Sequence, residues 1–223
     1  MTSQTVVFDL DGTMIDTAPD LILATNHVLV GAGYQPVTPE FIRPYISYGT
    51  RVMITEGIKH QGGTVQADHI DKMFADLIAF YGANIAIESR PFHGLTSVLN
   101  ALRARGVAIA ICTNKQEEMA RLLMAELGLT SYFKAITGRD TFPVCKPDPE
   151  HLLGTIKLAG GDARRSVMVG DSTTDYETAK SAKVPIIGVT FGYTDIPVTE
   201  LDCEAVISHY DEFLPAFDRV APV

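Results

Sequence analysis

The feature of this 223-residue chain that most limits its fold is an alternation of short apolar runs with longer segments whose apolar residues recur at helical spacing. Residues 95–105 place Leu95, Leu99 and Leu102 on one face of a predicted helix. Residues 107–112, which follow, are apolar at every position, as is typical of a strand buried on both faces of a sheet. A strand–helix unit of this kind indicates a parallel sheet.

The same alternation extends through most of the chain. Strands are predicted over residues 5–8, 107–112, 135–137, 166–169, 185–189 and 205–207, and helices over residues 19–30, 95–105, 116–127, 149–159 and 173–182. Repeated β–α units imply a parallel sheet that helices cover on both faces. We therefore expect an α/β fold with a doubly wound, Rossmann-like core.

Residues 17–90 interrupt this rhythm. Apolar residues recur there at helix-like intervals, glycines and prolines divide the segment into several helices, and no convincing buried strand is present. We interpret the segment as a helical insertion after the first strand. The predicted organisation is a core of residues 1–16 and 91–223 with a cap domain of residues 17–90.

Composition narrows the range of partners. The 27 acidic and 18 basic residues give a net charge of −9, which opposes binding to nucleic acid. No apolar run approaches the ~20 residues that span a bilayer, and the first residues lack a basic signal region, so no membrane partner is expected. Three widely spaced cysteines do not resemble a disulfide framework, which favours a cytoplasmic location.

Two aspartates, Asp9 and Asp11, end the first predicted strand, and Gly12 and Thr13 open the loop that follows. Residues two apart project to the same side of a strand end, so the two carboxylates repel unless a cation neutralises them or one keeps a proton. This arrangement suits a metal-bound nucleophile beside a group that moves protons. Taken alone, Asp-x-Asp-Gly would more often be ordinary turn chemistry.

Other polar residues follow later strands. Thr113 and Asn114 end one strand and open a helix, where a hydroxyl and backbone amides suit an anion. Asp171 and Asp175 follow another strand, about one helical turn apart. Ligands of open α/β sheets bind beyond the carboxyl ends of the strands, so these residues are expected to meet the first aspartates.

Lys146 adds a cation, in a loop stiffened by Pro147 and Pro149. Oxygen ligands without His or Cys suit a hard cation, and Mg²⁺ is the usual partner of phosphate chemistry. Each residue has a structural alternative, such as a helix cap for Thr113 or a solvated loop position for Lys146. The conjunction of all of them, in order along the chain, favours an active site.

These segments resemble the four motifs of the haloacid dehalogenase-like superfamily of phosphatases: Asp-x-Asp-Gly-Thr, a strand-end Thr or Ser, a Lys, and Gly-Asp-x-x-x-Asp. The insertion after the first motif is similar to the helical cap of the subclass that includes phosphoglycolate phosphatases, and the likeness covers nearly the whole chain. Three residues depart from the usual pattern. Arg139 and Lys183 stand where glycine is typical, and Cys145 stands where lysine is common.

The resemblance implies that Asp9 attacks phosphorus to give an aspartyl-phosphate, while Asp11 protonates the leaving alkoxide and later deprotonates water. It implies Mg²⁺ bound by Asp9, the backbone carbonyl of Asp11, Asp171 and Asp175, the last holding either a metal-bound water or Lys146. The residues implied to bind the phosphoryl group are Thr113, Lys146, Asn114 and Gly12.

Substrate specificity is expected in the cap. Arg51, just after Gly49 in a loop-to-helix segment, is the cap residue we predict to meet a substrate carboxylate, ahead of Arg43 and Lys59. A solvent-facing helix arginine is an equally good interpretation of Arg51.

The favoured activity is Mg²⁺-dependent hydrolysis of a small-molecule phosphate ester, 2-phosphoglycolate. A sugar phosphatase, a pyrophosphatase or a β-phosphoglucomutase-like enzyme shares the same motifs. A regulatory protein that forms a phospho-aspartate, as receiver domains do, is the alternative from another class. The chain is expected to be a monomer or a homodimer.

Overall fold

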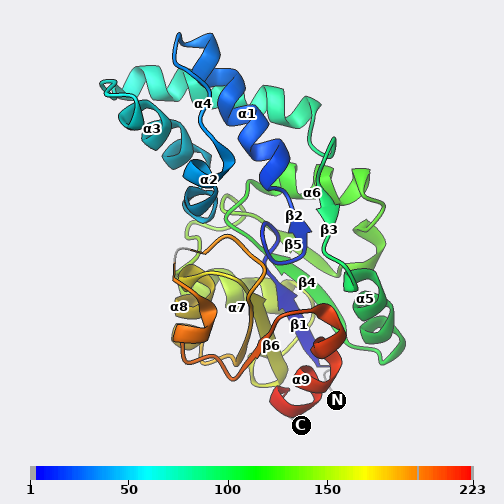
Figure 1. Ribbon diagram of the computed structural model, residues 1–223. Helices are drawn as coiled ribbons and strands as arrows, with labels where there is room; N and C mark the ends of the chain where they lie inside the picture. The colour runs from blue at the N-terminus through cyan, green and yellow to red at the C-terminus, as the bar shows by residue number, and fades with distance from the viewer. Residues whose placement is uncertain (1–3, 195, 222–223) are drawn as a thin grey trace.

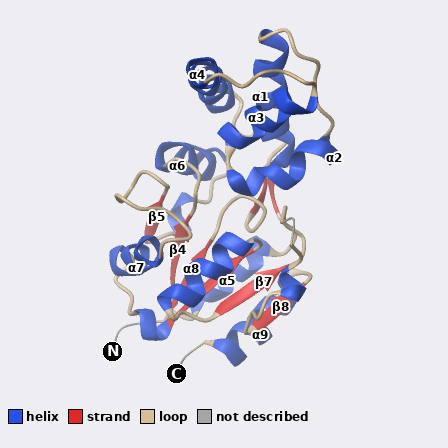
Figure 2. Ribbon diagram, turned by 90° about the vertical axis from the view of Figure 1, so that its left-hand side faces the viewer, coloured by secondary structure: helices blue, strands red, loops and turns tan. Residues whose placement is uncertain are grey.

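The computed structural model describes residues 4–194 and 196–221. Its main sheet has six parallel strands in the order β5–β4–β1–β6–β7–β8 (Figures 1 and 2). The strands are β1 Thr5–Phe8, β4 Ala108–Cys112, β5 Ala135–Thr137, β6 Ser166–Gly170, β7 Ile186–Val189 and β8 Ala205–Ile207. Because β1 lies between β4 and β6, the segments that follow these three strands emerge side by side.

Alternate side chains of each strand enter two separate cores. The helices around the sheet are α5 Leu95–Ala104, α6 Glu117–Glu126, α7 Pro149–Leu158, α8 Thr173–Ala182 and α9 Phe213–Val220 (Figure 2). Val6 and Phe8 of β1 pack in the core that α5, α6 and α9 close, whereas Val7 packs against α7 and α8. Both faces of the sheet are therefore buried, which explains the almost wholly apolar strands.

The segment between the short strands β2 (Ile15–Asp16) and β3 (Arg90–Pro91) is helical and stands apart from the sheet (Figure 1). Its elements are α1 Ala18–Gly31, α2 Pro39–Ile42, the 3₁₀-helix η1 Arg43–Tyr48, α3 Thr50–His60 and α4 Ala67–Ala83. β2 and β3 pair antiparallel, so the chain leaves the core and returns to it at adjacent points. The structure thus confirms the predicted fold class, a Rossmann-like α/β core with a helical cap.

Some elements have no counterpart in the sequence pattern. β2 and β3 have two residues each, too few for a strand periodicity to be visible. α9 packs Phe213 and Phe217 against the sheet, although the pattern predicts no helix there. The remaining 3₁₀-helices are η2 Thr130–Tyr132, η3 Ala163–Arg165, η4 Val198–Glu200 and η5 Tyr210–Glu212. Among the described residues, no helix is both long and apolar enough to cross a membrane.

Candidate active site

Three neighbouring strands of the sheet deliver the predicted catalytic residues to one place. Asp9 follows β1, Thr113 follows β4, and Asp171 follows β6. Asp175 comes from the first turn of α8, where it forms a capping box with Ser172. The order β4–β1–β6 therefore explains why residues more than 160 positions apart in sequence meet.

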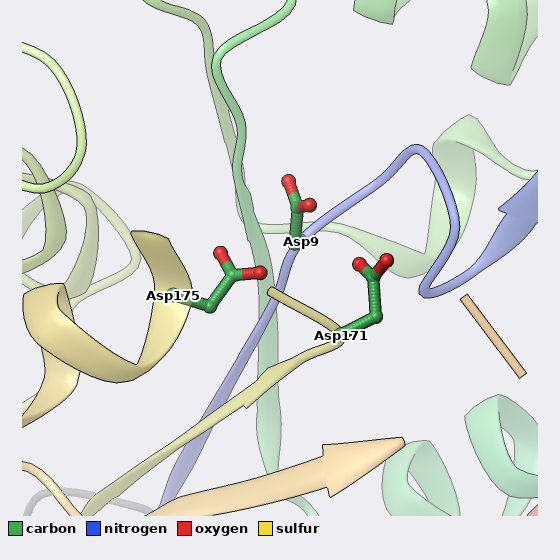
Figure 3. A group of neighbouring side chains, drawn as sticks. All are labelled: Asp9, Asp171 and Asp175. Carbon is green, nitrogen blue, oxygen red and sulfur yellow. The ribbon is translucent and has the colours of Figure 1, made fainter. Parts of the chain in front are cut away.

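Asp9, Asp171 and Asp175 form an acidic cluster in which one carboxylate oxygen of each residue lies within 4.8 Å of those of the other two. Figure 3 shows the three side chains converging from β1, from the end of β6 and from α8. All three are buried. Burial raises the pKa of Asp9 to about 6, against the opposing effect of Lys146. Burial, with Asp175 and Asp9 nearby, raises the pKa of Asp171 to about 8.

Lys146 places its ammonium group beside the acidic cluster. Its Nζ lies 2.8 Å from Asp9 Oδ1 and 2.6 Å from Asp175 Oδ1. Burial alone would lower the pKa of Lys146, but the two carboxylates together raise it above its ordinary value. The backbone holds the residue in place, because Asn114 Nδ2 donates to the Lys146 carbonyl at 3.0 Å and the Lys146 N–H donates to His151 Nδ1 at 3.2 Å.

The cluster fits a divalent cation. Three buried carboxyl groups face a single ammonium, and burial, together with the neighbouring carboxylates, raises the pKa of Asp9 and Asp171, so a further cation would be needed to hold all three carboxylates ionised. The Asp171 carboxylate is oriented by hydrogen bonds from Thr13 Oγ1 and the Tyr193 N–H, both 2.8 Å long. Oxygen-only donors of this kind suit Mg²⁺ rather than a softer metal.

Asp11 is not a member of the acidic cluster and is paired with Lys115 instead. Lys115 Nζ donates to both Asp11 carboxylate oxygens, at 3.0 and 3.1 Å, and the Lys115 side chain is only 6% exposed. The same ammonium lies 4.6 Å from the ring centroid of Tyr81, a residue of cap helix α4. Burial opposes the charge of Lys115, yet Asp11 and Tyr81 raise its pKa. Asp11 is thus a fixed carboxylate at the boundary between core and cap.

A cavity of about 80 Å³ lies between the cap and the ends of the strands. The core contributes polar groups to its lining, including Asp9, Asp11, Thr113, Asn114 and Lys146. The cap contributes mainly apolar walls: Leu21, Ile46, Phe74, Ile78 and Tyr81. Polar groups on the core side and apolar groups on the cap side of the cavity suit a small substrate whose charged end lies against the strand ends.

Two predicted substrate-binding residues lie elsewhere. Arg51 is not part of the cavity lining, because α3 turns it toward α4, where it pairs with Asp71 and lies 4.1 Å from the ring centroid of Phe74. Gly12 is also absent from the lining. Its φ is 82°, and a Cβ there would lie 2.6 Å from Asp171 Oδ2, so this glycine makes room for Asp171 instead.

Sequence reasoning misses the partners that orient the site. Thr13 belongs to the first motif and Tyr193 to none of the four, and no pattern in the sequence shows that both contact Asp171. Tyr81 belongs to an ordinary apolar stripe of α4 with Met73 and Leu77. Only the folded chain shows that this stripe ends above Lys115.

Comparison with known proteins places this site in a family. Residues 6–189 match the family described as haloacid dehalogenase-like hydrolase. The chain belongs to that family. It is therefore a hydrolase.

Relatives within the haloacid dehalogenase-like family extend the likeness over both parts of the chain. A phosphoglycolate phosphatase of Agrobacterium fabrum is 46% identical over 96% of this chain and 92% of its own length. One of Mesorhizobium japonicum is 45% identical over 95% of this chain and 93% of its own length. The crystal structure of a predicted phosphoglycolate phosphatase from Haemophilus somnus has a TM-score of 0.89 at 24% identity and covers 96% of this chain and 98% of its own, a likeness of fold.

Proposed function

We propose that this hydrolase is a Mg²⁺-dependent phosphomonoesterase that converts 2-phosphoglycolate to glycolate and phosphate. The observation that carries the proposal is the buried contact of Asp9 with Lys146, beside Asp171 and Asp175, on the floor of a small cavity. The names of the relatives support the choice of substrate.

Asp9 is the proposed nucleophile. Its carboxylate forms a bond to phosphorus while the bond between phosphorus and the ester oxygen breaks, which leaves an aspartyl-phosphate and an alkoxide. A buried carboxylate and a phosphate dianion repel each other, so the reaction needs positive charge at this point. Lys146 Nζ, 2.8 Å from Asp9 Oδ1, supplies part of it.

Asp11 is the proposed acid and base. In its protonated form it gives its proton to the leaving alkoxide, and the resulting carboxylate, which Lys115 stabilises, then takes a proton from the water that attacks phosphorus and releases Asp9. Lys115 holds both oxygens of Asp11, so the carboxylate stays beside the cavity in one orientation. This fixed geometry supports a role in proton transfer, which depends on hydrogen-bond reach to the substrate.

Thr113 and Lys146 are proposed to hold the phosphoryl oxygens. Thr113 Oγ1 accepts a hydrogen bond from the Lys115 N–H at 3.2 Å, so its own hydroxyl hydrogen can be directed to a phosphoryl oxygen. Asn114 keeps Lys146 in position through the Lys146 carbonyl. Donors that are already oriented before the substrate arrives stabilise the charge of phosphoryl transfer without reorganisation.

Asp9, Asp171 and Asp175 would hold Mg²⁺, with the Asp11 carbonyl as the further ligand that the resemblance implies. When bound, the ion supplies charge that neutralises the phosphoryl group as Asp9 approaches.

The proposal is tested by phosphate release from 2-phosphoglycolate, glucose phosphates, pyrophosphate and p-nitrophenyl phosphate, with Mg²⁺ and with a chelator. We expect metal-dependent turnover that is fastest with 2-phosphoglycolate. Similar rates with all four would contradict the substrate, and turnover that survives chelation would contradict the metal. Glucose-phosphate turnover above that of 2-phosphoglycolate would favour a sugar phosphatase.

A further inference from the structure

One charged residue that lines the cavity has no oppositely charged partner among the described residues. Asp9 contacts Lys146, and Asp11 contacts Lys115. The fifth charged residue of the lining, Arg139, makes no ion pair with any residue in the described ranges 4–194 and 196–221. The cavity therefore offers one cation beyond those that its own carboxylates engage.

The backbone of Arg139 is firmly held although its side chain is exposed. Its N–H donates to the Lys115 carbonyl at 3.0 Å, and the Gly138 N–H before it donates to Thr141 Oγ1 at 2.8 Å. A Cβ at Gly138 would lie 2.2 Å from Glu117 N, so the loop packs tightly on the start of α6. A long cationic side chain thus extends from a rigid base.

Arg139 reaches from the core to the cap. It follows β5 in sequence, yet its Nη1 lies 4.0 Å from the point where a side chain on Gly49 would begin. Gly49 joins η1 to α3 and lines the cavity with Ser47 and Thr50. The guanidinium is therefore at the cap side of the cavity, whereas Lys146 and Thr113 lie at the strand ends.

We propose that Arg139 binds the carboxylate of the substrate and so makes this enzyme selective for small phosphate esters that carry an acid group. The inference rests on the proposed phosphatase function and deepens it. A guanidinium matches a carboxylate with two parallel hydrogen bonds. The small volume and the apolar walls favour a short chain between the two anionic ends, as in 2-phosphoglycolate.

Arg139 belongs to the core, whereas the sequence pattern predicts that a cap residue, Arg51, binds the substrate carboxylate. Arg51 is paired with Asp71 and does not line the cavity.

The test compares 2-phosphoglycolate with ethyl phosphate, which has the same phosphate end but a methyl group in place of the carboxylate. The quantity measured is the ratio of the two kcat/KM values. We expect Arg139→Gln to lower this ratio by roughly 10- to 100-fold, the range of a hydrogen-bonded charge pair. Arg139→Lys, which keeps the charge but loses the planar fork, is expected to lower it less.

Arg219→Gln is the matched control. It removes the same charge from an exposed position on α9, where Arg219 makes no ion pair within the described ranges and does not line the cavity. The ratio should stay at its wild-type value. An unchanged ratio in Arg139→Gln, or an equal loss in Arg219→Gln, would overturn the proposal.

A binding measurement distinguishes failure of the proposed carboxylate site from failure of the proposed phosphatase function. In an Asp9→Asn background with Mg²⁺, calorimetry compares the Kd of 2-phosphoglycolate and of ethyl phosphate with and without Arg139→Gln. We expect the substitution to weaken 2-phosphoglycolate binding selectively. If the wild type releases no phosphate but this difference persists, the function fails and the carboxylate site stands. If both esters lose the same affinity, the site fails.

Discussion

At the scale of single residues, His151 is a buried side chain that helps to hold the backbone of Lys146 in place. Its side chain is fully buried, and its Nδ1 accepts the Lys146 N–H. Nδ1 therefore carries no proton in the folded protein, and protonation there would break the hydrogen bond that anchors the backbone of Lys146. Burial and the Lys146 charge lower the pKa of His151 to about 4.

This depressed pKa predicts a pH dependence of stability. The unfolded chain takes up the His151 proton near its ordinary pKa, whereas the folded protein resists protonation until about pH 4, so stability falls as the pH drops through that window. We expect the wild type to lose about 3 kcal/mol more than His151→Asn between about pH 7 and pH 4. Asparagine has an amide oxygen at the position of His151 Nδ1, so it keeps an acceptor for the Lys146 N–H, and it does not titrate. Urea unfolding of both proteins measures the difference, and identical pH profiles would contradict the prediction.

At the scale of elements, Asp20 joins the two crossings between core and cap. It lies in the first turn of α1, is 2% exposed, and accepts from the Glu88 N–H, the Ser89 N–H and Ser89 Oγ. One carboxylate thus ties the outgoing helix to the returning strand segment. Ser89 is fully buried, so its polar groups have no access to solvent if Asp20 is lost.

We therefore expect Asp20→Ala to destabilise the protein by about 3 kcal/mol and to lower Tm by about 10 °C. The cause is the loss of hydrogen bonds to a charged group together with buried donors left unpaired. Asp68→Ala is the control, since Asp68 is also a first-turn acid of a cap helix but is exposed. A Tm loss no greater than that of the control would show that Asp20 does not join the crossings.

The positions of the strand ends could be predicted from the sequence, whereas the contacts between the cap helices could not. The strand ends that carry Asp9, Thr113 and Asp171 could be predicted because apolar runs reveal strands, and parallel strands share one edge. The direction of Arg51 could not be predicted, since it depends on how α3 packs on Asp71 and Phe74 of α4. Pairings of this kind are properties of packing between helices and leave no local signal.

At the scale of the whole molecule, the acidic cluster concentrates negative charge at the junction of β1, β6 and α8. A divalent cation bound there would join segments that are far apart in the chain and would be absent from the unfolded state. Metal binding is therefore expected to stabilise the entire fold.

We expect saturating Mg²⁺ to raise the Tm of the wild type by roughly 5–10 °C, the effect of a ligand at about 100 times its Kd. Asp171→Asn should lose this increase. In chelator it should be at least as stable as the wild type, because its amide oxygen can accept the Tyr193 N–H and its amide nitrogen can donate to Thr13 Oγ1, while a carboxyl group whose pKa burial raises to about 8 is replaced by a neutral group. Differential scanning fluorimetry measures both effects. An equal Mg²⁺ response in the two proteins would place the metal elsewhere.

In the proposed reaction Asp9 carries the phosphoryl group during turnover. Acid quenching of the enzyme with 2-phosphoglycolate and Mg²⁺, followed by peptide mass mapping, tests this step. We expect one added phosphoryl group on the peptide that contains Asp9, with no addition when a chelator is present and no turnover in Asp9→Asn. Turnover that persists in Asp9→Asn, with no phosphoryl group on that peptide in the wild type, would contradict it.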